Sequence, residues 1–519
     1  MNGFPWLTLL WALPIVAALA ILALPAAART AAKYAGLAVS LVVALLSIIL
    51  AVRFDPAGER YQFVESHTWI RSFGAGYVVG LDGIALALVV LTAVLVPLLL
   101  IAGWKDADTR SGRGPHAYIA LTLGVEGMVL LSVAALDILL FYIFFEVMLI
   151  PMYFLIGAFG NRPSSSRAAT KFLLYNLAGG LVMLVAVIGL YVATANSPAL
   201  GGGTFDFRRV SAAVADGSLS IDPTVAHLLF GGFLFAFAIK APLWPLHRWL
   251  PDAAVFATPA SAVLMMAVMD KVGTFGMLRY CLPLFPDSSA VFAPAIIALS
   301  VFGIVYAAIL AIGQTDMMRL ISYTSISHFG FIVLGIFVMT SQGQSGAMLY
   351  MVNHGIATAA LFLIAGFLVS RRGSRAIADY GGVQTVAPML AGTFLIAGLA
   401  TLALPGLATF ISEFLVLIGT FTRYPAAAVI AATALVLSAV YVLWLYQRTM
   451  TGPVPEGSEK VTDLRPRELV VVAPLIALLI VLGLYPKIAL DVINPAVDDT
   501  LISINQSDPA PTLTAGGTR

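Results

Sequence analysis

Long apolar segments alternate with short polar connections along almost the whole chain. A helix needs about 20 apolar residues to cross a bilayer. The pattern predicts fourteen such helices, followed by a polar and loosely ordered tail from Asp491 onward. The predicted spans are 5–26, 31–53, 79–103, 116–134, 136–158, 169–194, 225–250, 258–281, 291–312, 318–340, 346–370, 386–420, 425–449 and 468–489.

Two of these spans contain residues that interrupt a helix. The seventh has Pro242 and Pro245 shortly after Lys240, and the twelfth has Pro405 and Gly406 within an unusually long apolar stretch. Proline removes a backbone donor and disrupts the turn before it. Broken helices at membrane depth are tolerated where they are buried in protein or line a wet cavity, and transporters place ion sites there. A kink without function is the alternative.

The spacing of the two interrupted spans predicts the domain organisation. They lie five spans apart, which suggests two repeats of five helices, 116–285 and 286–450, with inverted topology because the number of spans in each is odd. Residues 1–115 would form three N-terminal helices, and 451–519 the last helix and the polar tail. The predicted fold class is an all-α polytopic membrane protein.

Composition supports a membrane protein and excludes several other functions. The 519 residues are 60% hydrophobic and 10% charged, against about 25% charged residues in soluble domains. A net charge of +2 argues against nucleic-acid binding. The single cysteine, Cys281, cannot form an internal disulfide or a cysteine cluster. Without a Walker loop or a GxGxxG turn, we expect no nucleotide, flavin, iron–sulfur centre or metal in this chain.

The distribution of Lys and Arg predicts the orientation. The odd-numbered connections carry most of these residues, so they are expected to face the cytoplasm. Both termini would then lie at the outer face. The connection between the second and third spans is also basic, which makes the bias clear but not extreme.

Ionisable residues recur near the middle of several spans. A lysine at mid-bilayer costs about 2.5–3.5 kcal/mol on insertion scales, so membrane proteins place one there mainly where it has a function. His354 lies within a further span, and Asp137 and Asp316 lie at span ends, where they would cap or anchor helices. The residues at similar depth are Glu126, Glu146, Lys240, Lys271 and His328.

This set of residues can carry protons. Burial disfavours the charged form of an ionisable group, and a nearby opposite charge restores it, so moving that charge away ejects a proton. Histidine exchanges protons near neutral pH with little perturbation, which suits His328 and His354 to relay roles. Structural ion pairing, for example between Glu146 and Lys240, is the alternative. A lone buried histidine can also be a satisfied hydrogen-bonding group.

Four long motifs resemble the antiporter-like membrane subunits of respiratory complex I. The resemblance covers about residues 115–450. Within the family, the chain is most similar to the subunit called M in bacteria, the counterpart of chain 4 in mitochondria. Glu413 in the interrupted twelfth span is the reason, because sister subunits and many Mrp-type antiporter subunits usually have lysine there. The motifs are LLFYIFFEVMLIPMYFLIG (139–157), KAPLWPLHRWLPDA (240–253), DKVGTFGMLRY (270–280) and RLISYTSISHFGF (319–331).

The resemblance implies a role for several of these ionisable residues. Glu146 and Lys240 match the family's modulating ion pair. Lys271 matches the central proton-carrying lysine, linked through His328 and His354 and ordered water. Glu413 matches the terminal group that passes protons toward the outer face. Asp270 is a departure, since many relatives have an apolar residue there, and it leaves the charge around Lys271 open.

The resemblance also implies a function and partners. The chain would be a proton-translocating subunit of an NADH:quinone oxidoreductase in the bacterial plasma membrane, within a hetero-oligomer containing L-, N-, K-, J-, A- and H-type membrane subunits. NADH, FMN, iron–sulfur clusters and quinone would be bound by partner subunits. The alternatives are a subunit of a Mrp-type cation/proton antiporter, a membrane-bound hydrogenase subunit, and a purely structural scaffold.

Overall fold

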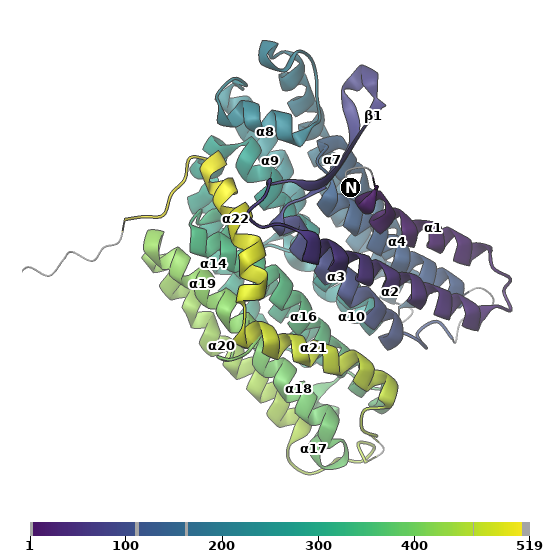
Figure 1. The fold of residues 1–519 in the computed structure, drawn as a ribbon. Helices are drawn as coiled ribbons and strands as arrows, with labels where there is room; N and C mark the ends of the chain where they lie inside the picture. Colours follow the sequence, from purple (N-terminus) through teal and green to yellow (C-terminus); the bar gives the residue numbers. More distant parts are fainter. Residues whose placement is uncertain (1–3, 109–113, 161–163, 460, 511–519) are drawn as a thin grey trace, which may run out of the picture.

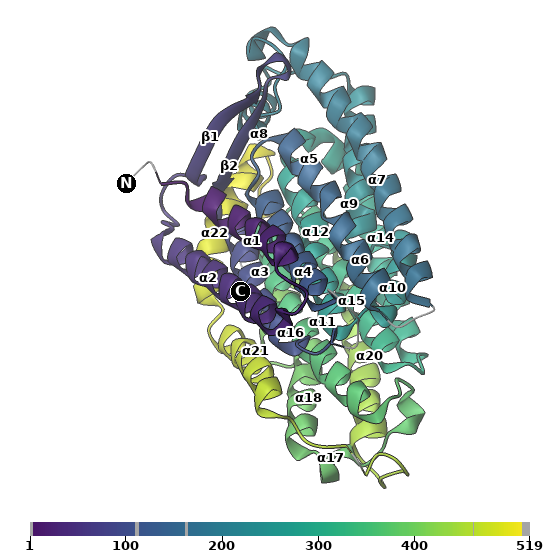
Figure 2. The ribbon, with the colours of Figure 1, turned by 90° about the vertical axis from the view of Figure 1, so that its right-hand side faces the viewer.

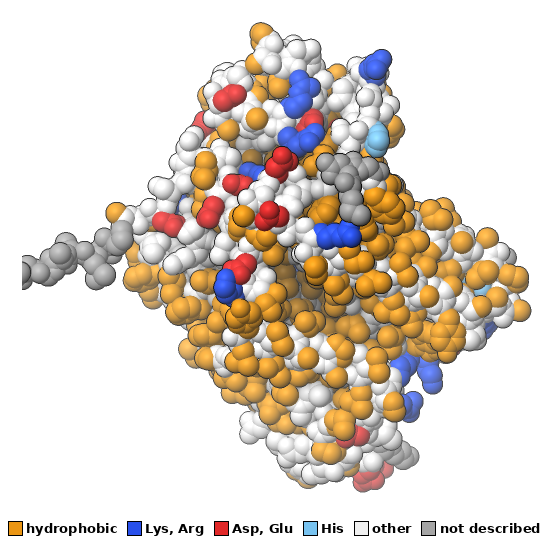
Figure 3. Space-filling model, in the orientation of Figure 1, with side chains coloured by type: hydrophobic (Ala, Val, Ile, Leu, Met, Phe, Trp, Pro, Cys, Tyr) orange, Lys and Arg blue, Asp and Glu red, His pale blue; other side chains and the backbone are white. Residues whose placement is uncertain are grey.

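The computed structural model describes residues 4–108, 114–160, 164–459 and 461–510. Helices make up most of it (Figure 1). Thirteen of the described helices are long and apolar enough to cross a membrane. Apolar side chains cover the middle of the surface, and charged side chains lie mostly toward its ends (Figure 3). The chain is therefore a multi-pass, all-α membrane protein, as predicted.

The N-terminal part adds a feature that the apolar pattern does not predict. A two-stranded antiparallel hairpin connects the second and third helices, and Figure 2 shows it at one end of the helical body, opposite α17. β1 is partly polar, so a search for apolar segments reads it as a connection, whereas the apolar end of β2 was assigned to the start of the predicted span 79–103. The elements are α1 (Trp6–Ala23), α2 (Arg29–Arg53), β1 (Gln62–Ile70), η1 (Arg71–Phe73), β2 (Ala75–Leu81) and α3 (Gly83–Ala102).

The first predicted repeat contains five spans, three of which are divided. The fifth is divided at Met148, and the seventh ends its first helix at Lys240, two residues before Pro242, as predicted. The eighth contains two π-helical stretches. The elements are α4 (Gly114–Ala134), α5 (Ile138–Val147), α6 (Leu149–Phe159), α7 (Ser164–Ala195), η2 (Pro198–Leu200), α8 (Phe207–Ala215), α9 (Pro223–Lys240), η3 (Leu246–Trp249), α10 (Leu250–Phe256), α11 (Pro259–Val263), η4 (Leu264–Met269), α12 (Lys271–Gly276), η5 (Met277–Cys281) and α13 (Leu282–Leu284).

The second predicted repeat and the C-terminal part follow. The predicted span 386–420 is divided between α18 and α19 around Pro405 and Gly406, which explains why thirteen rather than fourteen long helices are found. The elements are α14 (Pro286–Ile312), α15 (Met317–Phe337), α16 (Ser341–Arg372), η6 (Ile377–Asp379), α17 (Val383–Val386), α18 (Pro388–Thr401), α19 (Ala408–Arg423), α20 (Pro425–Met450), α21 (Pro466–Leu484) and α22 (Lys487–Ser503).

The prediction of a loosely ordered tail from Asp491 was wrong as far as Ser503. This segment belongs to α22, which packs on α3, α13 and α16 (Figure 1). Ile493, Val497 and Leu501 recur every four residues and are buried on one face of the helix. Composition alone hides this amphipathic spacing, because the polar residues between them lower the average hydrophobicity.

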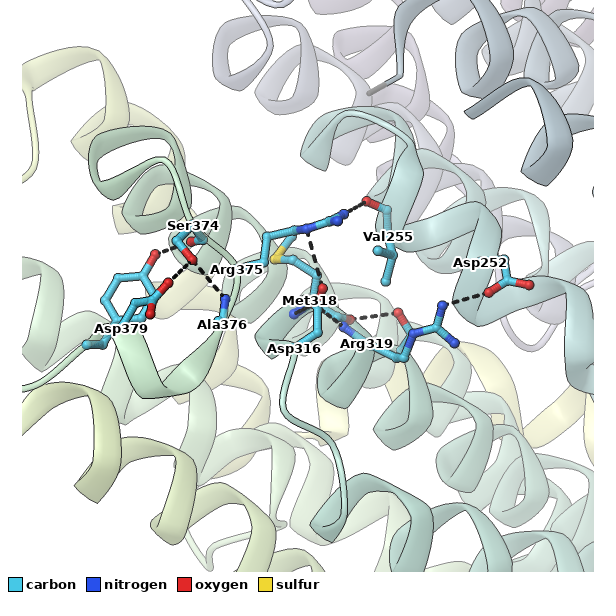
Figure 4. Close-up of polar contacts among 11 residues, drawn as sticks. Asp252, Val255, Asp316, Met318, Arg319, Ser374, Arg375, Ala376 and Asp379 are labelled. Atoms are coloured by element: carbon cyan, nitrogen blue, oxygen red, sulfur yellow. Dashed lines mark hydrogen bonds and ion pairs between the residues drawn. The ribbon is translucent and has the colours of Figure 1, made fainter. Parts of the chain in front are cut away.

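Ion pairs join several helix ends at the end of the molecule where α10 meets α15. Asp252 accepts from Lys171 and from Arg319, each at 2.7 Å, and so connects α7, α10 and α15. Arg375 lies 3.3 Å from Asp316, which also caps α15 as predicted. Figure 4 shows Asp252, Arg319, Asp316 and Arg375 side by side. We call Lys171, Asp252, Asp316, Arg319 and Arg375 the ion-pair cluster.

Candidate functional site

Lys240 ends α9 at the point where the seventh span is interrupted. Its side chain is 1% exposed, and Nζ donates a 2.6 Å hydrogen bond to the backbone oxygen of Phe145 on α5. Nζ also lies 3.6 Å from the centroid of the Phe145 ring, an arrangement that favours a cation. The interruption at Pro242 therefore leaves the lysine bound to the turn of α5 that carries Glu146.

Glu146 lies against Gly180 on α7. A Cβ at position 180 would collide with the Glu146 carboxyl group, so glycine provides its space. Both carboxylate oxygens are buried and have no hydrogen-bond partner in the described chain. Lys240 interacts with Glu146 electrostatically but donates its hydrogen bond to Phe145 instead. The two residues of the expected ion pair are thus neighbours without direct contact.

Lys271 begins α12, between the π-helical stretches η4 and η5. Such stretches are rare and occur frequently at functional sites. Nζ lies 2.5 Å from Nδ1 of His354 and 4.0 Å from the centroid of the Phe329 ring. The other ring nitrogen of His354 lies 3.1 Å from Oγ1 of Thr358. When Lys271 is charged, Nδ1 accepts its hydrogen bond and Nε2–H donates to Thr358.

A second group of side chains continues from His354 to Glu413. The His328 ring centroid lies 5.3 Å from that of His354 and 5.6 Å from that of Tyr350. The Tyr350 hydroxyl donates a 3.0 Å hydrogen bond to Oε2 of Glu413, which is 4% exposed and lies on α19, just beyond the interruption. Tyr350, His354 and Thr358 are spaced by four residues on α16, so one helix face presents all three.

Tyr350 is the residue among these neighbouring side chains that the sequence analysis missed. A tyrosine in an apolar span is an ordinary packing residue, and its composition gives no signal. The available signal was its position, one helical turn before His354.

Two further buried acidic residues differ in their surroundings. Asp270 is fully buried, lacks a hydrogen-bond partner in the described chain, and interacts electrostatically with both Lys271 and Lys240. It therefore lies near both lysines. Glu126 on α4 is also fully buried, but no charged neighbour among the described residues interacts with it. The structure thus places Asp270 with the two lysines and leaves Glu126 apart from them.

The resulting line crosses the molecule from α5 to α19. It consists of lysines, carboxyl groups, imidazoles and a phenol, all of which can exchange protons, and it lies inside an apolar bundle. Within the described residues, no group of three or more His, Cys, Asp or Glu side chains could hold a metal ion. We call this succession of side chains the buried line. Its members in order are Glu146, Lys240, Asp270, Lys271, His354, His328, Tyr350 and Glu413.

Comparisons with known proteins agree with the predicted resemblance. Residues 135–438 match the family described as "NADH:quinone oxidoreductase/Mrp antiporter, TM". The chain is 64% identical to the NADH-quinone oxidoreductase subunit M of Mycobacterium tuberculosis, covering 99% of this chain and 97% of that protein.

Solved structures show the same fold. A chain of respiratory complex I from Thermus thermophilus with bound NADH is 30% identical and superposes with a TM-score of 0.85, covering 96% of this chain and 99% of that one. A chain of the Mrp complex from Dietzia sp. DQ12-45-1b superposes with a TM-score of 0.80 at 20% identity, covering 97% and 99%, which shows a common fold alone. The chain therefore belongs to the NADH:quinone oxidoreductase/Mrp antiporter family of membrane proteins.

Proposed function

We propose that this chain is the proton-translocating membrane subunit M of an NADH-quinone oxidoreductase. The buried line from Glu146 to Glu413 carries the proposal, because it places proton-exchanging groups in succession through an apolar bundle. The high identity to a subunit M over the full chain supports the choice of complex. The chain would hold no redox centre, so electron transfer elsewhere in the assembly would drive it.

Each residue of the line has a proposed role. Glu146 modulates the charge of Lys240, whose hydrogen bond to Phe145 holds it beside that carboxyl group. Lys271 is the central proton carrier, and His354, at 2.5 Å, is its first acceptor. His328 relays the proton onward, and Glu413 passes it toward the outer face. Asp270 couples the two lysines electrostatically. It interacts with both, so a change of charge on one lysine changes the interaction of Asp270 with the other.

The partners and the setting are proposed together. The L-, N-, K-, J-, A- and H-type membrane subunits would surround this chain in a bacterial plasma membrane, and the NADH, FMN, iron–sulfur clusters and quinone would belong to partner subunits. The excess of Lys and Arg in the odd-numbered connections supports placing those connections in the cytoplasm and both termini at the outer face.

Inverted membrane vesicles carrying Lys240→Ala or Glu413→Ala test this function. We expect NADH-driven quinone reduction and proton uptake to fall together while the complex still assembles on a native gel. Lys487→Ala is the control, because this exposed lysine on α22 pairs with Asp491, far from the line in sequence and contacts. Wild-type activity in both variants would overturn the proposal.

The Mrp-type alternative makes a different prediction for the same vesicles. A cation/proton antiporter exchanges protons when Na⁺ or K⁺ is added, without NADH. Cation-driven exchange that is independent of NADH, and is lost in Glu413→Ala, would identify that function instead.

A further inference from the structure

A cavity of about 460 Å³ lies outside the buried line, where the ends of α3, α11 and α16 meet the beginning of α21. Its apolar wall includes Pro259, Leu363 and Phe367. Gly366 lets α16 approach this wall closely, because a Cβ there would lie 2.6 Å from the Pro259 ring. The volume is within the range of about 300–1,000 Å³ that small-molecule sites occupy.

Positive charge exceeds negative charge around this cavity. Figure 3 shows Lys and Arg side chains at the edge of the molecule beside the beginning of α21. The basic residues that line the cavity are Lys105, Arg371, Arg465 and Arg467, and the acidic ones are Asp106 and Glu468.

Both acidic residues already accept hydrogen bonds from other groups of the chain. Glu468 accepts hydrogen bonds from the Arg371 side chain and from the backbone N–H of Arg465. Asp106 accepts a 3.3 Å hydrogen bond from the Tyr118 hydroxyl, and burial raises the pKa of Asp106, which favours its neutral form. Glu468 is therefore committed to Arg371, and Asp106 interacts with Arg467 electrostatically without forming an ion pair with it among the described residues.

Three of the basic residues remain available to a ligand. Nη1 of Arg467 is buried without a hydrogen-bond partner, and no ion pair within the described chain involves Lys105, Arg465 or Arg467. A buried donor without an acceptor is costly. The planar guanidinium matches the geometry of phosphate oxygens, and a bound phosphate would supply the missing acceptor.

The surface beside the cavity favours a lipid over a soluble ion. Val470 is 56% exposed and follows Arg467 by three residues, so both lie on the same side of α21. Val481 and Leu484 continue the exposed apolar surface along this helix, at 46% and 71% exposure. An acyl chain can therefore extend along α21 from a headgroup held at its beginning.

We propose that this cavity binds the phosphate group of an anionic phospholipid, with Lys105, Arg465 and Arg467 as its ligands. The phosphate accepts the free hydrogen bonds of the two arginines, and the acyl chains lie along α21. The lipid thereby connects α21 to the ends of α3 and α16. Basic pockets at the ends of membrane helices are a common form of phospholipid site.

The test uses the intact membrane complex in nanodiscs that contain a photoactivatable phosphatidylglycerol. Cross-links are mapped by mass spectrometry to this chain only, so lipid on other subunits does not interfere. We expect labelled peptides from 102–106, 363–371 or 465–470. The combined variant R465Q/R467Q should lower this labelling about 25-fold, because each basic residue near an anionic lipid contributes about fivefold.

Two more variants make the result specific. Lys105→Gln alters an exposed side chain and should lower the labelling about fivefold without affecting folding. Arg448→Gln, at the end of α20 and outside the cavity, should leave it unchanged. Equal labelling of the wild type and R465Q/R467Q would overturn the proposal. So would a loss of labelling in Arg448→Gln as large as the loss in R465Q/R467Q.

Competition distinguishes the sources of phosphate. Excess unlabelled phosphatidylglycerol should remove the cross-links, and phosphatidylcholine should compete more weakly because its headgroup has no net charge. Complete competition by inorganic phosphate at millimolar concentration would overturn the lipid assignment and identify a site for soluble phosphate.

Discussion

At the scale of single residues, Tyr350 connects the histidines of the buried line to Glu413. We expect Tyr350→Phe to remove the hydrogen bond to Glu413 while the ring still packs beside His328. A hydrogen bond contributes about 0.5–1.5 kcal/mol, so NADH-driven proton uptake should fall about two- to tenfold. Tyr280→Phe is the matched control, because its buried hydroxyl donates to the backbone of Ala135 instead. Equal rates in the two variants would remove Tyr350 from the line.

Gly180 provides a way to move Glu146 without removing its charge. An alanine at this position would push against the carboxyl group, the mobile end of a flexible side chain, so we expect Gly180→Ala to fold normally and to pump more slowly. Gly189→Ala on the same helix meets the end of Leu229 instead and serves as the control. The rate of NADH-driven proton uptake in vesicles is the measurement. Unchanged uptake in Gly180→Ala would show that the position of Glu146 is not critical.

Sequence reasoning found the charged members of the line but not their contacts. Lys240, Lys271 and Glu413 stand out because an isolated charge in an apolar span is costly and rare. Tyr350 does not stand out, because tyrosine is common in such spans. The hydrogen bond from Lys240 to Phe145 depends on how α5 and the interrupted α9 pack together, which no local pattern contains.

At the scale of elements, the interruption between α18 and α19 contains a glycine in a left-handed backbone conformation. Gly406 has φ of +93°, a backbone conformation that side chains rarely adopt. We expect Gly406→Ala to destabilise the protein by about 1–2 kcal/mol through this strain, since a Cβ there has open space around it. Gly392→Ala within α18 also has open space, and should instead be neutral or stabilising by up to about 1 kcal/mol. Thermal unfolding of the solubilised complex measures both, and an equal effect of the two substitutions would contradict this explanation.

The sequence predicts elements well where one strong local signal decides them. Proline and glycine marked the interruptions of the seventh and twelfth spans correctly, because their backbone restrictions act within a single turn, but the division of the fifth span at Met148 was not predicted. The hairpin β1–β2 and helix α22 were missed, since β1 and α22 are not apolar enough to be noticed, the apolar β2 runs into the start of a span, and each element is held by packing on distant segments. The π-helical stretches around Lys271 are equally invisible, because the residues that form them are ordinary helix-forming residues.

At the scale of the whole molecule, the ion-pair cluster holds the ends of α7, α10 and α15 together, and its central carboxylate, Asp252, lies between the predicted spans 225–250 and 258–281. Burial would raise the pKa of Asp252, but hydrogen bonds from Lys171 and Arg319 outweigh it and hold the pKa below its usual value. The stabilisation is therefore complete above the unfolded pKa of about 3.9 and is lost as pH falls through the lower folded value. Each half-exposed ion pair contributes up to about 1 kcal/mol.

This pH dependence is measurable with Asp252→Asn. We expect the wild type to unfold at a higher temperature than the variant above about pH 5, and the difference to shrink toward zero below about pH 4. Asp287→Asn, which alters an exposed carboxylate outside the cluster, should differ little from the wild type at any pH. A difference between wild type and Asp252→Asn that stays constant through this range would show that the carboxylate charge is not what stabilises the cluster.

Helix α22 restricts how the molecule can move during transport. It packs on α3, on α13 of the first predicted repeat and on α16 of the second predicted repeat, so it crosses the predicted boundary between the parts that would have to separate. Many secondary transporters work by rocking one bundle against the other around a fixed site. The same motion here would require α16 to slide beneath α22 and expose Ile493 and Val497, which are fully buried. Proton movement in this protein is therefore expected to proceed by rotation of side chains and rearrangement of hydrogen bonds, within a backbone that keeps one arrangement throughout the cycle.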